Sequence, residues 1–298
     1  MDVRITQTML TRQILSDIQN NYTRMSQLQS QAASGKRINK PSDDPVGVGF
    51  VLRYKDELAS YQQYQSNAGA AQSWLKYTDS TMQQADTVMQ RLRDLAVQGA
   101  SDTFSPDDRK AMASEVGQLY DQLVSIANTQ FSGQYIFNGQ LTTQAPYPQD
   151  KDPATVVTDT GSVLYDIGDA RLPVNVSGNS YFGAPSDADN AFAVAKQLED
   201  ALNNNDAQAI SDVLGKIDSR YNQMLAVQAN VGAREDRVQL AQNRLQDMTQ
   251  NITSLLSNTE DADMAKVIVD LQAAENVHTA SLLVASRVIQ PTLVDFLK

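Results

Sequence analysis

The sequence predicts a mainly α, elongated protein: a nested helical rod with long coiled-coil-like helices and a small β-rich inserted domain. Three observations support this fold class. Apolar residues recur at steps of three and four near both ends of the chain. A seven-residue apolar repeat runs through residues 210–252. Residues 141–185 instead carry several prolines, glycines and short β-favouring runs. A chain that goes out and returns would bring both termini to one end.

Composition narrows the chemistry. The 298 residues are 41% hydrophobic, which is typical of a folded soluble chain. Cysteine is absent and histidine occurs once, at His278, so thiolate catalysis, disulfides and most zinc sites are excluded. The formal charge of −11 does not favour a nucleic-acid surface, which needs clustered cations. No apolar run reaches membrane-spanning length, and the first residues do not resemble a cleaved signal peptide.

The first predicted helix carries one apolar stripe and ends before Gly35. Its apolar residues are spaced as on one face of a helix. We propose this stripe as one side of an assembly interface, formed by Ile14, Ile18, Tyr22, Met25 and Leu28.

The stretch SGKRINKPSDDPVG, residues 34–47, breaks this helix and starts the next. Gly35 suits a helix C-cap, Asp44 an N-cap, and Pro45 the first helical position. We predict that this stretch is a turn between domains. Its candidate residues are Gly35, Arg37, Asn39, Pro41, Asp43, Asp44 and Pro45.

The middle of the chain alternates helices with a short β segment. A stripe from Leu75 to Ala96 predicts a long helix, and Ser105-Pro106 predicts a capped start for the next. The run FSGQYIFNG favours a short hairpin. A second long helix is predicted over about residues 207–257, because apolar residues recur there at every seventh position. These are Ile210, Ile217, Met224, Val231, Val238, Leu245 and Ile252.

The last segment repeats the pattern of the first, with an apolar and small-residue stripe up to Pro291. From this stripe we take four residues as the second side of the assembly interface: Ile268, Leu271, Leu282 and Ile289. Such terminal helices cannot bury an apolar face alone. They form either an intramolecular hairpin or a seam completed by neighbouring subunits, and periodicity does not choose between these.

Three domains are therefore expected. Residues 1–40 and 262–298 would form one domain of terminal helices. Residues 41–140 and 186–261 would form a helical rod with a short hairpin. Residues 141–185 would form a β-rich outer insert.

Possible reactive groups have simpler structural explanations. Adjacent carboxylates beside prolines, as at Asp43 and Asp44, more often cap helices and fix turns than bind metal. His278 lies on a small and apolar helical stripe without a nucleophile or metal motif around it. The cations Lys36, Arg37 and Lys40 are expected to pair locally or with a neighbouring subunit. The acids of residues 150–169 lack the spacing of a calcium loop. No catalytic residue, metal site or cofactor is predicted.

Both ends of the chain resemble one known family. The run ASGKRINKPSDDPVG and the C-terminal AAENVHTASLLVASRVIQPTLVDFL are similar to the paired signatures of the bacterial flagellin and hook-associated family. Within it, RINKPSDDPVG, GQYIFNG and IQPTLVDFL are more similar to hook–filament junction members than to filament flagellins.

This resemblance implies a structural, non-enzymatic subunit of the extracellular flagellum, exported by the type III apparatus without a cleaved signal peptide. It implies that residues 1–40 and 262–298 are loose in the monomer and become an inner coiled-coil assembly domain. Implied partners are copies of itself, an adjoining hook-associated protein, flagellin, and a cytoplasmic export chaperone at the C-terminal region, with neither nucleic acid nor membrane. A filament subunit is the alternative, and an extracellular hydrolase the remote one.

Overall fold

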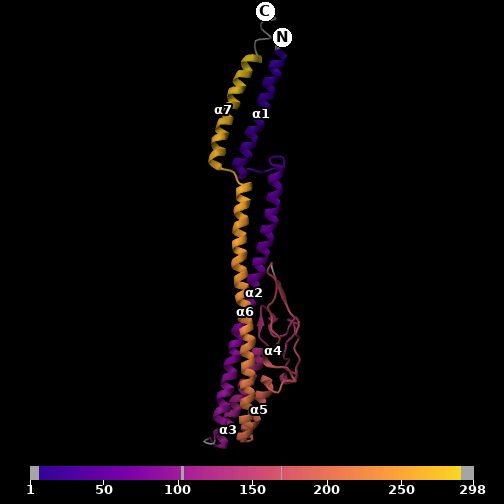
Figure 1. Cartoon of the computed structure of the whole chain (residues 1–298), viewed down its shortest axis with the longest axis vertical. Helices are drawn as coiled ribbons and strands as arrows, with labels where there is room; N and C mark the ends of the chain where they lie inside the picture. The colour runs from indigo at the N-terminus through magenta and orange to yellow at the C-terminus, as the bar shows by residue number, and fades with distance from the viewer. Residues whose placement is uncertain (1–6, 102–103, 169, 290–298) are drawn as a thin grey trace, which may run out of the picture. The chain divides into compact units, whose positions relative to one another are not determined.

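The computed structural model describes residues 7–101, 104–168 and 170–289, and long helices dominate it (Figure 1). The elements are α1 (Gln7–Ser34), α2 (Pro45–Gly99), α3 (Pro106–Ala127), β1 (Gln130–Phe131), β2 (Gln134–Tyr135), the 3-10 helix η1 (Pro153–Thr155), β3 (Leu164–Asp166), β4 (Arg171–Pro173), α4 (Gly178–Phe182), α5 (Ala191–Asn203), α6 (Ala207–Glu260) and α7 (Met264–Ile289). The predicted mainly α class with a small β part is confirmed. Among these residues no helix has the length and apolar character needed to cross a bilayer.

The helices begin and end where the sequence predicts. Gly35 follows α1 with a positive φ of 72°, and its N–H donates to the Gln31 carbonyl at 2.8 Å. Only glycine adopts this conformation without strain, so it closes the helix. Asp44 caps α2, because its Oδ1 accepts from the Gly47 N–H at 2.8 Å. Ser105 and Asp108 form a reciprocal capping box at the start of α3.

The chain divides into two compact units, which we describe separately. The terminal unit contains residues 1–60 and 248–298, and the central unit contains residues 61–247. Both α2 and α6 contribute to each unit, because packing changes partway along these two continuous helices. The division into three domains stays a prediction.

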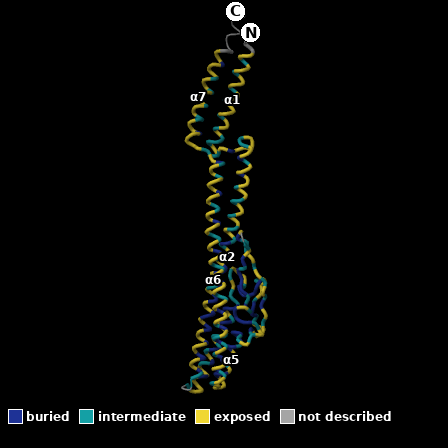
Figure 2. The backbone as a smooth tube through the Cα atoms, viewed as in Figure 1, coloured by how far each residue is buried: buried dark blue, intermediate teal, exposed yellow. Residues whose placement is uncertain are grey.

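In the central unit α2 and α6 run antiparallel. Gln72 Nε2 donates to Gln239 Oε1 at 2.8 Å, and Arg93 Nε meets Asp218 Oδ1 at 2.6 Å. The predicted stripe of α2 is fully buried, as Figure 2 shows for this part of the chain. The seven residues of the predicted α6 repeat, six in this unit and Ile252 in the terminal unit, are buried as well. An uninterrupted seven-residue spacing keeps one seam facing its partner, which explains this burial.

The predicted short hairpin is confirmed, and its turn lies at the Gly133 end of the run FSGQYIFNG. β1 pairs with β2 antiparallel, Gln130 opposite Tyr135. The two turn residues, Ser132 and Gly133, both have positive φ, as a two-residue hairpin with matching twist requires.

The insert contains less β structure than its β-favouring runs suggested. Its strands are β3 and β4, three residues each, and the rest is mostly irregular or helical. Its prolines explain this, because each removes a backbone donor that a longer ladder would need. An aromatic cluster joins the insert to the helices of the same unit. It consists of Phe137, Tyr147, Tyr181, Phe182 and Phe192.

Buried polar groups fasten the insert to the helices. The Tyr181 hydroxyl lies 2.8 Å from both Asp86 Oδ1 and the Met82 carbonyl oxygen of α2, and these two acceptors share its one proton. Burial raises the pKa of Asp86, and the Tyr181 hydrogen bond opposes that rise only in part. On α6, the buried Arg220 guanidinium pairs with Asp187 and Asp189 of the segment before α5. The Tyr181 contacts join the insert to the central unit's core, and the Arg220 pairs hold the segment that follows the insert.

Candidate assembly site

Two chain connections meet in the terminal unit. The connection after α1, residues 35–44, lies against the one between α6 and α7, residues 261–263. The Arg37 N–H donates to the Glu260 carbonyl at 2.7 Å, and the Ala262 N–H donates to the Gly35 carbonyl at 2.9 Å. Lys36 and Asp261 pair as an antiparallel bridge. We call this arrangement the paired turns. It satisfies backbone groups at the ends of α1 and α6 that would otherwise lack partners.

A single carboxylate holds the paired turns together. Glu260 Oε1 lies 2.8 Å from Lys36 Nζ and 2.7 Å from Lys55 Nζ, and its side chain is 8% exposed. Burial opposes its charge, but hydrogen bonds from the two ammonium groups prevail and hold the pKa of Glu260 below its usual value. The pKa of Lys36 is raised, mainly by the hydrogen bond and charge of Glu260. Sequence reasoning missed Glu260 and Lys55, because nothing local marks a partner more than 200 residues away.

The remaining charges of the predicted turn act mainly on their own backbone. Asp43 Oδ2 accepts from the N–H groups of Asn39 and Lys40 at 3.0 and 2.8 Å. The Gly47 N–H, and then Arg37, lower the pKa of Asp44. The turn thus uses its acids as caps and turn braces. Within the described chain the Lys40 ammonium has no carboxylate partner, and the pairing expected of Lys36 goes to Glu260.

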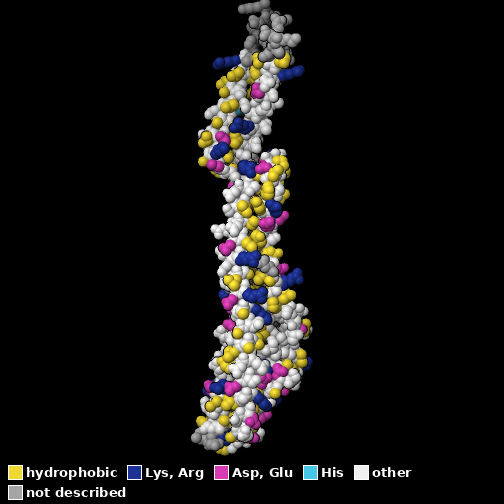
Figure 3. Space-filling model, in the orientation of Figure 1, with side chains coloured by type: hydrophobic (Ala, Val, Ile, Leu, Met, Phe, Trp, Pro, Cys, Tyr) yellow, Lys and Arg dark blue, Asp and Glu magenta, His cyan; other side chains and the backbone are white. Residues whose placement is uncertain are grey.

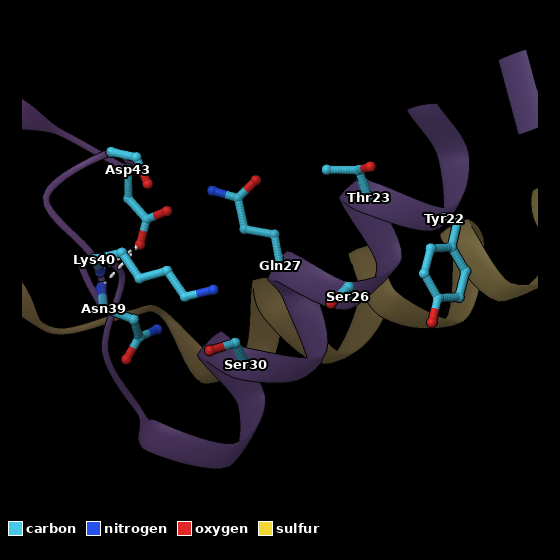
Figure 4. A pocket seen from close by; sticks show the side chains of 9 residues that line it. Tyr22, Thr23, Ser26, Gln27, Ser30, Asn39, Lys40 and Asp43 are labelled. Atoms are coloured by element: carbon cyan, nitrogen blue, oxygen red, sulfur yellow. Dashed lines mark hydrogen bonds between the residues drawn. The ribbon is translucent and has the colours of Figure 1, made fainter. Parts of the chain in front are cut away.

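A polar cleft lies between α1 and the turn (Figure 4). Its volume is about 310 Å³. The side chains of Gln27 and Lys40 extend into it, with Thr23, Ser26 and Ser30 along the helix side and Asp43 at the turn. Hydroxyl, amide and ammonium groups dominate the lining. It is therefore a surface for polar contacts and lacks the apolar walls of a small-molecule pocket.

The two terminal helices form an antiparallel pair (Figure 1). Asn21 Nδ2 donates to Ser281 Oγ at 3.1 Å, and the rings of Tyr22 and His278 lie 6.1 Å apart. The N-terminal stripe faces α7 with half-buried side chains at Ile14, Ile18, Met25 and Leu28, whereas Tyr22 is 60% exposed. The pair therefore exists within one chain, as the hairpin alternative proposed.

The face of α7 that packs against α1 is shifted by about one residue position from the predicted stripe. Val267 and Ala285 are buried and Leu271 is half-buried, but Ile268 and Leu282 are 49% and 47% exposed. The Ile289 side chain lies outside the described residues. The polar Ser281 lies in the contact between the two helices. The sequence pattern predicted its neighbour Leu282 instead, because Leu282 is apolar. Whether the exposed members contact neighbouring subunits stays a prediction.

Much apolar surface of this pair remains open. Figure 3 shows hydrophobic side chains reaching the surface along it. A shallow groove runs between the helices, with Ile14 and Ile18 on one side and Val277, Ala280 and Val284 on the other. Exposed patches of this kind mark surfaces that other proteins cover.

Comparison with known proteins assigns the family. Residues 5–142 match the bacterial flagellin N-terminal helical region, and residues 214–297 match the bacterial flagellin C-terminal helical region. The flagellar filament 33 kDa core protein of Treponema phagedenis is 27% identical over 93% of this chain and 91% of its own length. Flagellar hook-associated protein 3 of Salmonella typhimurium is 26% identical over 89% of this chain and 90% of its own length.

A solved structure shares the fold. The putative flagellar hook-associated protein from Vibrio parahaemolyticus superposes with a TM-score of 0.68 at 18% identity, covering 74% of this chain and 100% of that one. The two matched family regions contain α1, α2 and α3 at one end and most of α6 with α7 at the other. These are the helices that carry the paired turns and the open apolar faces, and the chain belongs to the bacterial flagellin family.

Proposed function

We propose that this chain is a structural subunit that joins the flagellar hook to the filament, and that it acts by packing against other subunits. The observation that carries the proposal is its match to hook-associated protein 3, which extends over 89% of this chain and 90% of the relative. A match over nearly the whole length of both chains supports a shared role better than a match limited to the terminal helices.

The open faces of the terminal pair support the packing mechanism. Ile14, Ile18 and Leu271 contribute to the contact within one chain, while Tyr22, Ile268 and Leu282 present apolar surface outward. Burying about 100 Å² of such surface contributes about 2.5 kcal/mol. Neighbouring subunits that cover these faces would therefore gain several kcal/mol each, without any chemical step.

The proposed partners follow from the same surface. Copies of this chain, an adjoining hook-associated protein and flagellin would cover it in the extracellular assembly. Before export, by the flagellar type III route and without a cleaved signal, a cytoplasmic chaperone would cover the C-terminal region. The exposed Val269, Leu283 and Val284 on α7 support this need, because an uncovered apolar helix face favours premature association.

A filament subunit is the second candidate, and one comparison favours it. The Treponema phagedenis relative is a flagellar filament core protein that matches over a similar length. In this alternative the same open faces would pack along a polymer of many copies, whereas a junction subunit would form a short layer between two different proteins.

Deleting the gene in its own host separates the two candidates. The cell surface would be examined for hooks and filaments, and the medium assayed for flagellin. Bare hooks with flagellin shed into the medium are the result expected for a junction subunit, because export continues with no base for the filament. Bare hooks without major flagellin anywhere would identify the filament subunit. Intact motile filaments would contradict both.

A further inference from the structure

The first turns of α2 carry an exposed aromatic and cationic cluster. Phe50 and Tyr54 stack with their ring centroids 6.3 Å apart. The Arg53 guanidinium carbon lies 5.1 Å from the Phe50 centroid and 5.8 Å from that of Tyr54. Phe50 is 42% exposed, and Val46, one turn earlier on the same face, is 70% exposed. We call Val46, Phe50, Arg53 and Tyr54 the α2 cluster. Val46, Phe50 and Arg53 are exposed to solvent, whereas Tyr54 is half-buried, because it lies on the same side of the helix as the buried Gly47 seven residues earlier.

Arg53 lacks an ionic partner in its own chain. Within the described residues its guanidinium has no hydrogen bond and no carboxylate within ion-pair distance, although Lys36, Arg37 and Lys55 nearby all have one. A guanidinium held on two rings keeps its five donors available at the ring edges. Arginine and aromatic residues are also enriched at the centres of protein interfaces. The cluster therefore has the composition of a docking surface for a partner that carries a carboxylate.

The C-terminal helix carries a surface of complementary chemistry. Ile268, Glu275 and Leu282 follow one another at intervals of seven, so they share one side of α7. All three are exposed, and the Glu275 carboxylate has no hydrogen bond or ion pair within the described chain. We call these three residues the α7 stripe. It offers one acid between two apolar side chains, spaced about 10 Å apart along the axis.

Net charge favours the same pairing. Residues 1–60 contain eight basic and six acidic side chains, whereas residues 248–298 contain six acidic and three basic ones. Association of the first segment of one copy with the last segment of another is therefore electrostatically favourable, and association of like segments is not. Within one chain the α2 cluster and the α7 stripe make no bond to each other, so the matching partner is a second copy.

We propose that, in the assembled protein, the α2 cluster of one copy docks on the α7 stripe of a second copy. The Arg53 guanidinium pairs with the Glu275 carboxylate, while Phe50 and Tyr54, stacked on each other, pack together against the α7 surface next to Glu275. The contact is heterologous, because each copy uses different surfaces on its two sides, and such contacts build rings or helical layers. This inference rests on the proposed assembly function and specifies one contact within it.

Charge reversal tests the pairing in a strain that lacks the chromosomal gene. R53E and E275R are each expected to lower the fraction of cells with filaments about tenfold, because like charges then meet at the contact. The double variant is expected to recover most of the loss, since the pair is restored in reverse. R237E, which reverses an exposed arginine on α6 in the central unit, is the matched control and should behave as the unchanged protein.

The outcomes separate this contact from the assembly function itself. Unchanged filament formation in R53E and E275R, or a double variant no better than either single one, overturns the contact while leaving the proposed function intact. If the strain without the gene still makes intact filaments, the proposed function itself is wrong. The substituted sites are exposed, so the variants are expected to fold. Circular dichroism of the purified variants checks this. A photo-crosslinking residue at position 50 should give a product with residues 264–287 of a second copy, and a product with another protein alone would contradict the proposal.

Discussion

The central unit and the terminal unit use similar amphipathic helices in opposite ways. In the central unit the predicted stripes of α2 and α6 are buried against each other and against α3, α5 and the insert. In the terminal unit most of the predicted α1 residues are half-buried, most of the predicted α7 residues that the structure describes are exposed, and large apolar side chains such as Leu15, Val269 and Leu283 are open. The central unit therefore buries its apolar helix faces within the chain, while the terminal unit leaves part of its apolar faces exposed and available to partners.

The largest expected effect is a core truncation in the central unit. Leu92→Ala removes a fully buried side chain and should lower the free energy of unfolding by about 3 kcal/mol, through lost burial and the cavity left behind. Ile18→Ala in the terminal pair should cost about 1 kcal/mol, because that side chain is only half-buried. Urea unfolding of the monomer measures both. Equal losses would mean that the two units are equally self-sufficient.

The next effect concerns the buried Asp86 and depends on pH. Burial raises the pKa of Asp86 in the folded chain above its unfolded value of about 3.9. Its protonated form therefore favours folding, and that stabilisation is present in acid and lost as pH rises through the folded pKa. Asp86→Asn keeps an acceptor for Tyr181 without the charge. Its free energy of unfolding, relative to the unchanged protein, should increase from about pH 3 to pH 7.

The control for this prediction is Tyr181→Phe. It leaves the Asp86 carboxylate without its hydroxyl donor and should lower stability by about 2 kcal/mol at neutral pH. A D86N variant whose relative stability falls with rising pH would contradict the assigned direction of the pKa shift.

A smaller effect is expected at the paired turns. Glu260→Gln removes the charge shared by Lys36 and Lys55 and should cost about 1 kcal/mol, because both lysines remain partly exposed. Because the pKa of Glu260 is lowered by folding, its carboxylate contributes this stability fully at pH values above the pKa of the unfolded chain. The contribution is lost as the pH falls through the pKa of Glu260 in the folded chain. Amide exchange at Arg37 and Ala262 measures the opening. Central-unit amides should be unaffected, and their acceleration would contradict the division into units.

The smallest effect on folding, with a larger one on assembly, is expected at the start of α2. Replacing Asp44 by Ala and Pro45 by Gly removes the cap and frees the turn, so folding stability should fall slightly. The central unit should stay folded by circular dichroism while assembly on the hook is weakened. Ser105→Ala removes the cap of α3 at a similar cost and serves as the matched control. Unchanged assembly in the first variant would defeat the role given to the turn.

Local signals in the sequence predicted the fold well. Glycine at 35, the Asp44–Pro45 pair and the seven-residue repeat of α6 each act within a few residues, so their structural meaning could be recognised without tertiary information. The insert was harder to predict, because its structure depends on distant partners such as Asp86, which Tyr181 contacts.

The candidate site was predicted only in part, for a similar reason. The turn at residues 35–44 was found, yet the charge that holds it, Glu260, lies more than 200 residues away. On α7 the apolar residues outnumber those that one seam can cover, so periodicity could not decide between the face turned to α1 and the face left open. The interface role of the open residues stays a prediction.

The paired turns also have a mechanical consequence. A pull on the terminal helices reaches the rest of the chain through two parallel connections, and backbone hydrogen bonds at Arg37 and Ala262 join these connections side by side. Bonds loaded in this way share the force and must yield together, so neither connection can stretch or twist on its own. The joint should therefore transmit torque stiffly while each helix beyond it remains free to bend.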